Sequence, residues 1–141
     1  MPSQPPIEVV AVVLLAPDGR LLTVRKRGTT RFMLPGGKPE PGEPAPSAAV
    51  REVREEIGLV LPEEALTPLG DWEGEAANEP GRGLLAHVYR ASDPVTVSSV
   101  NPSGEIAELR WLGPEDAGAL GAPALAPLLT AHIRGERCGG L

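Results

Sequence analysis

Three glutamates with helical spacing are the residues of this sequence best suited to chemistry. Glu52, Glu55 and Glu56 lie at positions i, i+3 and i+4, so a helix would present their carboxylates on one face. Like charges at these spacings repel by about 0.2–0.5 kcal/mol per pair. One interpretation is a solvated face on which Arg51 and Arg54 are the local counter-charges. The other is a site for a hard divalent cation, because Mg²⁺ and Mn²⁺ prefer clustered carboxylate oxygens.

The segment around these glutamates predicts a helix that begins near two prolines and ends before Gly58. Pro44 and Pro46 suit the first turn, where backbone N–H groups have no partner within the helix. Gly58 suits the position just past the last turn, because glycine adopts the left-handed conformation readily. Apolar residues at i, i+3 and i+7 predict the face that packs on a core, namely Val50, Val53 and Ile57. The helix would therefore have one packing face and one carboxylate face.

The stretch Gly37–Leu59 resembles the signature of the Nudix hydrolases, enzymes that cut nucleoside diphosphates linked to another group. The family pattern is Gly, five residues, Glu, seven residues, then Arg-Glu-apolar-any-Glu-Glu-any-Gly-apolar. A chance match is expected at about 10⁻¹⁰ per starting position at ordinary residue frequencies. Every position of the pattern is matched, by Gly37, Glu43, Arg51, Glu52, Val53, Glu55, Glu56, Gly58 and Leu59.

The resemblance implies roles for the acidic residues of the site. Glu52, Glu55 and Glu56 are the implied ligands of Mg²⁺, with Mn²⁺ as the alternative ion, and Gly37 adds its backbone carbonyl. Glu52 and Glu55 are also candidate catalytic residues. Family members differ in which glutamate takes the proton of the attacking water, and one alternative to Glu52 is Glu105, which precedes the last expected strand. The other interpretation of Glu105 is an ordinary residue at the start of that strand.

Other residues of the motif are expected to support its geometry. Glu43 at the loop–helix junction and Arg51 on the helix flank can form a clamp between a carboxylate and a guanidinium. Gly58 is expected to be structural, because it suits the left-handed position that ends the helix. Glu40, in the loop before the helix, has two interpretations: it reaches the metal through a water molecule, or it is only solvated.

Residues near the motif are candidates for binding substrate. Arg25, Arg27 and Lys38 are candidate phosphate contacts, although a solvated side chain is the commoner state of an exposed charge. Phe32 leads directly into the glycine-rich loop and is the candidate for stacking on a nucleobase. Trp111 lies in an alternating stretch and is expected to belong to the core.

The rest of the chain predicts strands on both sides of the central helix. Strands are expected at Glu8–Ala16, Leu21–Arg27, Phe32–Leu34, within Leu66–Glu75, and at Leu84–Arg90, Val95–Val97 and Glu105–Leu112. Pro62–Glu64 is expected to be a turn or a short helical piece. Further helices are expected to open at Pro114 and to lie within Pro123–Arg134. This order is α/β, and the resemblance implies the Nudix fold, a mixed β-sheet sandwiched between α-helices.

Length and net charge limit the number of domains and the kinds of partner that the chain can have. The 141 residues predict one domain over 1–141, with residues 1–6 and 135–141 flexible. A net charge of −6 argues against binding to nucleic-acid polymers or anionic membranes. The apolar run Val9–Ala16 is too short to cross a bilayer. The first residues lack a signal-peptide pattern, so we expect a cytoplasmic protein.

The predicted function is metal-dependent hydrolysis of a pyrophosphate linkage in a nucleoside diphosphate derivative. The stretch Arg25–Lys38 resembles compact MutT-like members, so a nucleoside triphosphate, cut to a nucleoside monophosphate and pyrophosphate, is the first candidate substrate. One alternative is a nucleotide-sugar or ADP-ribose hydrolase. Another is a non-catalytic nucleotide-binding or sensor module, although such modules generally lose the motif's glutamates. The implied partner is a small nucleotide, and families of this kind often form homodimers.

Overall fold

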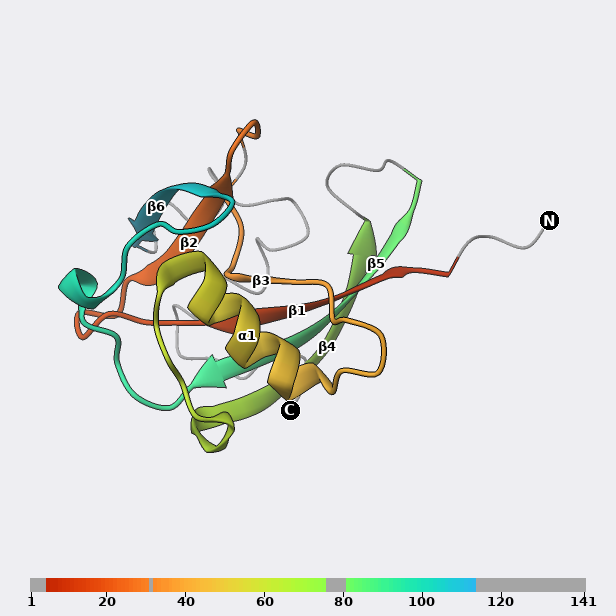
Figure 1. Cartoon of the computed structure of the whole chain (residues 1–141), viewed down its shortest axis with the longest axis horizontal. Coiled ribbons are helices and arrows are strands. Elements are labelled where there is room, and N and C mark those ends of the chain that lie inside the picture. Colours follow the sequence, from red (N-terminus) through yellow and green to blue (C-terminus); the bar gives the residue numbers. More distant parts are fainter. Residues whose placement is uncertain (1–4, 31, 76–80, 114–141) are drawn as a thin grey trace.

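The computed structural model describes residues 5–30, 32–75 and 81–113, which form a four-stranded sheet, a two-stranded sheet and the helix α1 (Figure 1). β1 runs parallel to β5, and the other neighbouring strands are antiparallel, so the larger sheet is mixed. The larger sheet has the strand order β3 (Gly36–Gly37), β1 (Ile7–Val13), β5 (Gly83–Ala91) and β4 (Leu66–Glu75). The smaller sheet pairs β2 (Leu21–Lys26) with β6 (Ile106–Leu112) in antiparallel fashion.

The helix α1 (Ala45–Ile57) lies across one face of the larger sheet (Figure 1). Its N-cap residue is Pro44 in an extended conformation, and Gly58 ends it with a left-handed φ of 73°. Both ends agree with the sequence prediction. The apolar residues buried on the helix are Ala48, Ala49, Val53 and Ile57, whereas the predicted core residue Val50 is only half-buried.

Buried apolar residues form two clusters, which use opposite faces of β1. Val10 and Val12 belong to the larger cluster, together with the packing face of α1. Ala11 and Val13 belong to the smaller cluster, together with alternate residues of β5. Burying a valine side chain fully contributes about 1.5–3 kcal/mol. The central part of β1 is therefore buried on both faces, which is what its continuous apolar sequence predicts.

The strand predicted at Phe32–Leu34 is wrong. Met33 makes only an isolated bridge to Val24, and the strand at this point is the glycine pair of β3. β3 lies at the glycines because β1 approaches the chain closely there. A Cβ at Gly36 would overlap the backbone carbonyl of Val10, so a glycine is required where these two strands meet.

Smaller differences concern the ends of elements and one loop. β1 ends at Val13 instead of Ala16. The strand predicted at Val95–Val97 is wrong, because the chain forms the 3₁₀ helix η2 (Val97–Ser99) there. The helical piece predicted near residue 63 is present as the 3₁₀ helix η1 (Glu63–Ala65).

The helices predicted beyond residue 113, residues 1–4 of the flexible start predicted at 1–6, and the flexible end predicted at 135–141 lie outside the described residues. Among the helices that are described, none is long and apolar enough to cross a membrane.

Candidate active site

Glu56 is a carboxylate inside the protein, on the side of α1 that faces β3. Only 5% of the residue is exposed, and its Oε1 accepts a hydrogen bond from the Gly36 N–H at 3.1 Å. Burial raises the pKa of Glu56 to about 7, and the charges of Glu52 and Glu105 add to this rise. No ion pair involving Glu56 occurs among the described residues. Because an unpaired buried anion is costly, this carboxylate is stabilised by a proton, as its raised pKa reflects, or by a cation bound beside it.

Glu52 packs against the backbone of β3, one helical turn before Glu56. A Cβ at Gly37 would overlap the Glu52 carboxylate, so the glycine makes room for it. The side chain of Glu52 is 15% exposed. Burial raises the pKa of Glu52, the charges of Glu55 and Glu105 act in the same direction, and the charge of Arg51 opposes them. The second carboxylate is therefore also held close to the glycine-rich strand.

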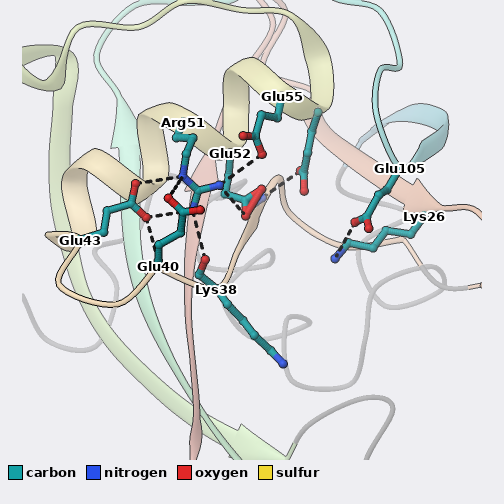
Figure 2. A network of polar contacts seen from close by, with 10 residues as sticks. Lys26, Lys38, Glu40, Glu43, Arg51, Glu52, Glu55 and Glu105 are labelled. Atoms are coloured by element: carbon teal, nitrogen blue, oxygen red, sulfur yellow. Dashed lines mark hydrogen bonds and ion pairs between the residues drawn. The ribbon is translucent and has the colours of Figure 1, made fainter.

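Arg51 joins the loop before the helix to the carboxylates on the helix (Figure 2). Its Nε and Nη2 donate to the two carboxylate oxygens of Glu43, each at 2.9 Å. Its Nη2 also donates to the Lys38 carbonyl at 3.2 Å. Its Nη1 lies 3.2 Å from Glu55 Oε1 and 3.6 Å from Glu52 Oε2. The two-point contact between Arg51 and Glu43 has the geometry that was expected of a clamp.

The clamp changes the proton affinity of both of its members. The hydrogen bonds from Arg51, followed by one from the Glu40 N–H at 2.9 Å, lower the pKa of Glu43 to about 2. The same hydrogen bonds from Arg51 to Glu43 raise the pKa of the Arg51 guanidinium. The Glu40 carboxylate is 68% exposed and lies 3.8 Å from the Arg51 Nε.

Within the described parts of the chain, no three histidine, cysteine, aspartate or glutamate side chains converge in a ready-made metal cluster. Glu52 and Glu55 contact Arg51, whereas Glu56 faces a backbone N–H. Glu55 is 53% exposed, and an exposed i, i+4 pair contributes only about 0.3–0.5 kcal/mol. Glu55 can therefore give up its ion pair with Arg51 and bind a cation with little loss of free energy. The donor set of three carboxylates, one of them buried and unpaired, fits a hard divalent ion.

The turn before β6 brings another carboxylate to this site (Figure 2). Glu105 Oε2 lies 4.0 Å from the Nζ of Lys26, which ends β2, and the Glu105 side chain is 82% exposed. The two charges act on the helix carboxylates in opposite directions. Glu105 raises the pKa values of Glu52 and Glu56, whereas Lys26 lowers them. The structure thus brings together the helix glutamates and the downstream glutamate.

The two arginines predicted as phosphate contacts bind other parts of the protein. Arg25 donates from Nε to the Glu108 carboxylate at 3.0 Å and from Nη1 to the Thr29 carbonyl at 2.8 Å. Arg27 donates from Nη1 to the Gly104 carbonyl at 2.6 Å. Both side chains therefore support local structure, and a phosphate contact stays a prediction for each.

Lys38 and Phe32 differ in how accessible they are. Figure 2 shows the Lys38 side chain extending away from Arg51, and the residue is exposed. Phe32 is only 5% exposed, and Cζ of Arg110 lies 5.1 Å from the centre of its ring. Stacking of a base on Phe32 would require Arg110 to move, and the stacking role stays a prediction.

Two contributions to the site were not found by sequence reasoning. Lys26 ends β2 just after a register shift in its pairing with β6, and its charge lowers the pKa values of Glu52 and Glu56. Its basic side chain at the end of a predicted strand is the signal that sequence reasoning could have used. The hydrogen bond from the Gly36 N–H to Glu56 has no sequence signal, because neighbouring glycines are indistinguishable until the strand register is known.

The chain matches the NUDIX domain description over residues 5–132. It is 33% identical over 133 residues to the CTP pyrophosphohydrolase of Escherichia coli strain K12, covering 90% of this chain and 91% of that protein. It is 32% identical over 130 residues to the m7GpppN-mRNA hydrolase NUDT17 of Bos taurus, covering 80% of this chain but only 43% of that protein's length.

A solved structure has the same fold. The MutT protein from Methanosarcina mazei Go1 superposes with a TM-score of 0.76 at 23% identity, covering 96% of this chain and 98% of the other. The chain therefore belongs to the NUDIX domain family and has the Nudix fold. The fold and the complete motif define its class as that of the Nudix hydrolases, enzymes that act on phosphorus-containing anhydrides.

Proposed function

We propose that this Nudix hydrolase uses Mg²⁺, or Mn²⁺ in its place, to cut a nucleoside triphosphate into a nucleoside monophosphate and pyrophosphate. Water adds across one P–O–P linkage, and the bond to the pyrophosphate group breaks. The observation that carries the proposal is the buried, unpaired carboxylate of Glu56 beside Glu52. A carboxylate in such a position is unfavourable until it is neutralised, and a bound divalent cation neutralises it at a pH where the proton has left.

Glu52, Glu55 and Glu56 would hold the ion, with the Gly37 carbonyl as a further oxygen ligand. When bound, the ion supplies positive charge to the phosphate oxygens and lowers the pKa of water. The chain itself orients the ligands. The Gly36 N–H holds Glu56, and the missing side chain of Gly37 leaves room for Glu52.

Glu105 is proposed as the group that accepts a proton from the attacking water, with Glu52 as the alternative. The Glu105 side chain is 82% exposed, whereas that of Glu52 is 15% exposed. A proton acceptor must be within reach of the water that it deprotonates. The exposure of Glu105, and its electrostatic effect on Glu52 and Glu56, support this assignment.

A nucleoside triphosphate is proposed as the substrate because the E. coli relative, 91% of which this chain covers, is named a CTP pyrophosphohydrolase. Arg25 and Lys38 would contact its phosphates, and Phe32 its base. The net charge of −6 favours a small ligand that arrives with a metal ion over a nucleic-acid polymer. The cytoplasm is the location that this substrate implies.

A pyrophosphate-release assay with Mg²⁺ tests the proposal on nucleoside triphosphates. Chromatographic separation of the products tests nucleotide sugars, ADP-ribose and dinucleoside polyphosphates, because their hydrolysis releases no pyrophosphate. We expect turnover of a nucleoside triphosphate that is lost in Glu55→Gln. Glu64→Gln, in η1, is the matched control and should keep the wild-type rate. Turnover of nucleotide sugars or ADP-ribose alone would move the substrate to that class. Thermal stabilisation by a nucleotide without any turnover would overturn hydrolysis in favour of a binding module.

A further inference from the structure

The loop between η2 and β6 caps the helix that carries the glutamates. The Asn101 N–H donates to the Ile57 carbonyl at 3.2 Å, and the Ser103 N–H donates to the Glu56 carbonyl at 2.9 Å. Carbonyls in the last turn of a helix have no partner within the helix. The loop supplies partners for two of them, so its position is tied to the end of α1.

Arg27 holds the other side of the same loop through two donors. Its backbone N–H donates to the Glu105 carbonyl at 2.9 Å, and its Nη1 donates to the Gly104 carbonyl at 2.6 Å. Gly104 has a φ of 58°, and a Cβ there would lie 3.2 Å from the Glu55 carbonyl. The turn that carries Glu105 therefore lies between the end of α1 and Arg27.

The Glu105 side chain is held only weakly by its own contacts. It is 82% exposed, and the ion pair recorded for it is the 4.0 Å contact with Lys26. Exposed pairs of this kind contribute about 0–1 kcal/mol. The position of the Glu105 carboxylate therefore depends mainly on its backbone. A hydrogen bond from a charged guanidinium to a backbone carbonyl is about twice as strong as a neutral one.

We propose that Arg27 is a positioning residue for hydrolysis: its guanidinium fixes the Gly104–Glu105 turn and so keeps the Glu105 carboxylate beside the carboxylate face of α1. The inference rests on the proposed function, in which Glu105 accepts a proton from water. It differs from the phosphate contact that the sequence suggested for Arg27. A phosphate contact acts on the substrate and is independent of Glu105, whereas a positioning residue acts only through Glu105.

A double-mutant cycle separates these two roles. Steady-state kinetics with Mg²⁺ are measured for wild type, Arg27→Gln, Glu105→Gln and the double variant, on the nucleoside triphosphate that is cut fastest in the release assay. Removing a general base is expected to lower kcat about 100-fold. Displacing it is expected to lower kcat about 10-fold in Arg27→Gln, with KM changed less than about twofold. In the Glu105→Gln background, Arg27→Gln should change kcat by less than about twofold.

Two further variants are controls for this interpretation. Arg27→Lys keeps a cationic donor and should recover part of the rate lost in Arg27→Gln, which shows that the loss is not due to misfolding. Arg20→Gln removes an exposed arginine that pairs with Asp18 at 2.7 Å, and it should keep the wild-type rate. The melting temperature of each variant is measured in the same buffer.

Several outcomes would overturn the inference. Multiplicative effects of the two substitutions, a rise in KM at constant kcat, or an unchanged kcat in Arg27→Gln would each show that Arg27 does not act through Glu105. A wild-type rate in Glu105→Gln would remove the positioning role while leaving the hydrolase intact. A wild-type protein that turns over no nucleotide would remove the proposed function, and the inference with it.

Discussion

At the scale of single residues, Glu56 combines features that an acidic side chain seldom has together. It is buried, its recorded hydrogen bond comes from a backbone N–H, and its pKa is raised to about 7, chiefly by burial. Acidic residues are almost never fully buried unless they are paired. A cation bound beside this carboxylate would therefore stabilise the folded protein.

We predict that Glu56→Gln removes most of the stabilisation that Mg²⁺ gives to the folded protein. In wild type, Mg²⁺ at a hundredfold excess over its dissociation constant should raise the free energy of unfolding by about 2.7 kcal/mol, because it binds only the folded state. A neutral amide at position 56 removes the buried charge that attracts the ion. Urea unfolding with and without Mg²⁺ measures both effects.

Glu64→Gln is the control for this prediction, because Glu64 is exposed and lies outside the site. It should show the full Mg²⁺-dependent stabilisation. An equal Mg²⁺ effect in wild type and Glu56→Gln would remove Glu56 from the set of metal ligands.

At the scale of elements, the contact between α1 and β3 places the carboxylates. The two glycines of β3 serve different purposes. A Cβ at Gly36 would overlap the backbone of Val10, whereas a Cβ at Gly37 would overlap the movable carboxylate of Glu52. The first glycine permits the approach of two strands, and the second permits the approach of a side chain.

We predict that alanine at these two glycines has different effects. Gly36→Ala should lower the free energy of unfolding by about 1–3 kcal/mol, because backbone has to move to admit the methyl group. Gly37→Ala should cost less stability, because Glu52 can turn away, but it should lower activity strongly. Thermal melts and the release assay are compared for both variants. A fully active Gly37→Ala would contradict the role given to the space beside Glu52.

His87 joins three neighbouring strands of the larger sheet. Its Nε2 lies 2.7 Å from Glu8 on β1, and its Nδ1 lies 2.8 Å from Asp71 on β4. The hydrogen bond with Glu8, followed by that with Asp71, raises the pKa of His87, while partial burial opposes the rise. The two carboxylates lie on opposite ring nitrogens, so the group links strands and does not form a chelating site. Burial raises the pKa of Tyr89 on the same strand, and the charge of Asp71 adds to this rise.

We predict that the His87 link makes stability depend on pH above neutrality. The folded pKa of His87 exceeds its unfolded value of 6.5, so the link is fully present below about pH 6.5 and is lost as the pH rises through the folded pKa. The melting temperature of wild type should therefore fall more than that of Glu8→Gln between about pH 6 and about pH 9. The same loss in both proteins would show that the link does not contribute.

At the scale of the whole molecule, an acidic protein is proposed to bind an acidic substrate. The chain carries 19 acidic and 13 basic residues, and the carboxylates of Glu52, Glu55, Glu56 and Glu105 act on one another's pKa values or lie together at the site. Arg51 and Lys26 are cations whose charges act on these carboxylates, but Arg51 is already bound to Glu43. We therefore expect the positive charge that holds a polyphosphate to come largely from bound metal. The predicted homodimer stays a prediction.

We predict that nucleotide binding requires a divalent ion. A nucleoside triphosphate should raise the melting temperature in Mg²⁺ and should raise it little in the presence of a chelator, because repulsion between the carboxylates and the phosphates is then unscreened. The measurement is a thermal-shift titration under both conditions with Glu55→Gln, which cannot turn the nucleotide over. An equal shift in chelator would mean that the basic side chains suffice.

The elements that were predicted correctly are those with strong local signals. α1 begins at prolines and ends at a glycine, and β1 is a continuous run of β-branched and small apolar residues. The errors fall where local signals are weak. β3 consists of two glycines, which have low strand propensity and are held in place by pairing with β1. The valines near residue 97 favour a strand, but no neighbouring strand pairs with them among the described residues.

The sequence by itself determined the family and predicted the carboxylate ligands, because the motif is local and its spacing places three glutamates on one helix. Only the tertiary structure decided how unequal those glutamates are. Glu56 is buried against an N–H twenty residues away, whereas Glu55 remains exposed. It also decided that Arg27 reaches the Gly104 carbonyl across 77 residues of chain. Such contacts depend on strand register and on where a loop meets a helix end, and neither is encoded in the local pattern of residues.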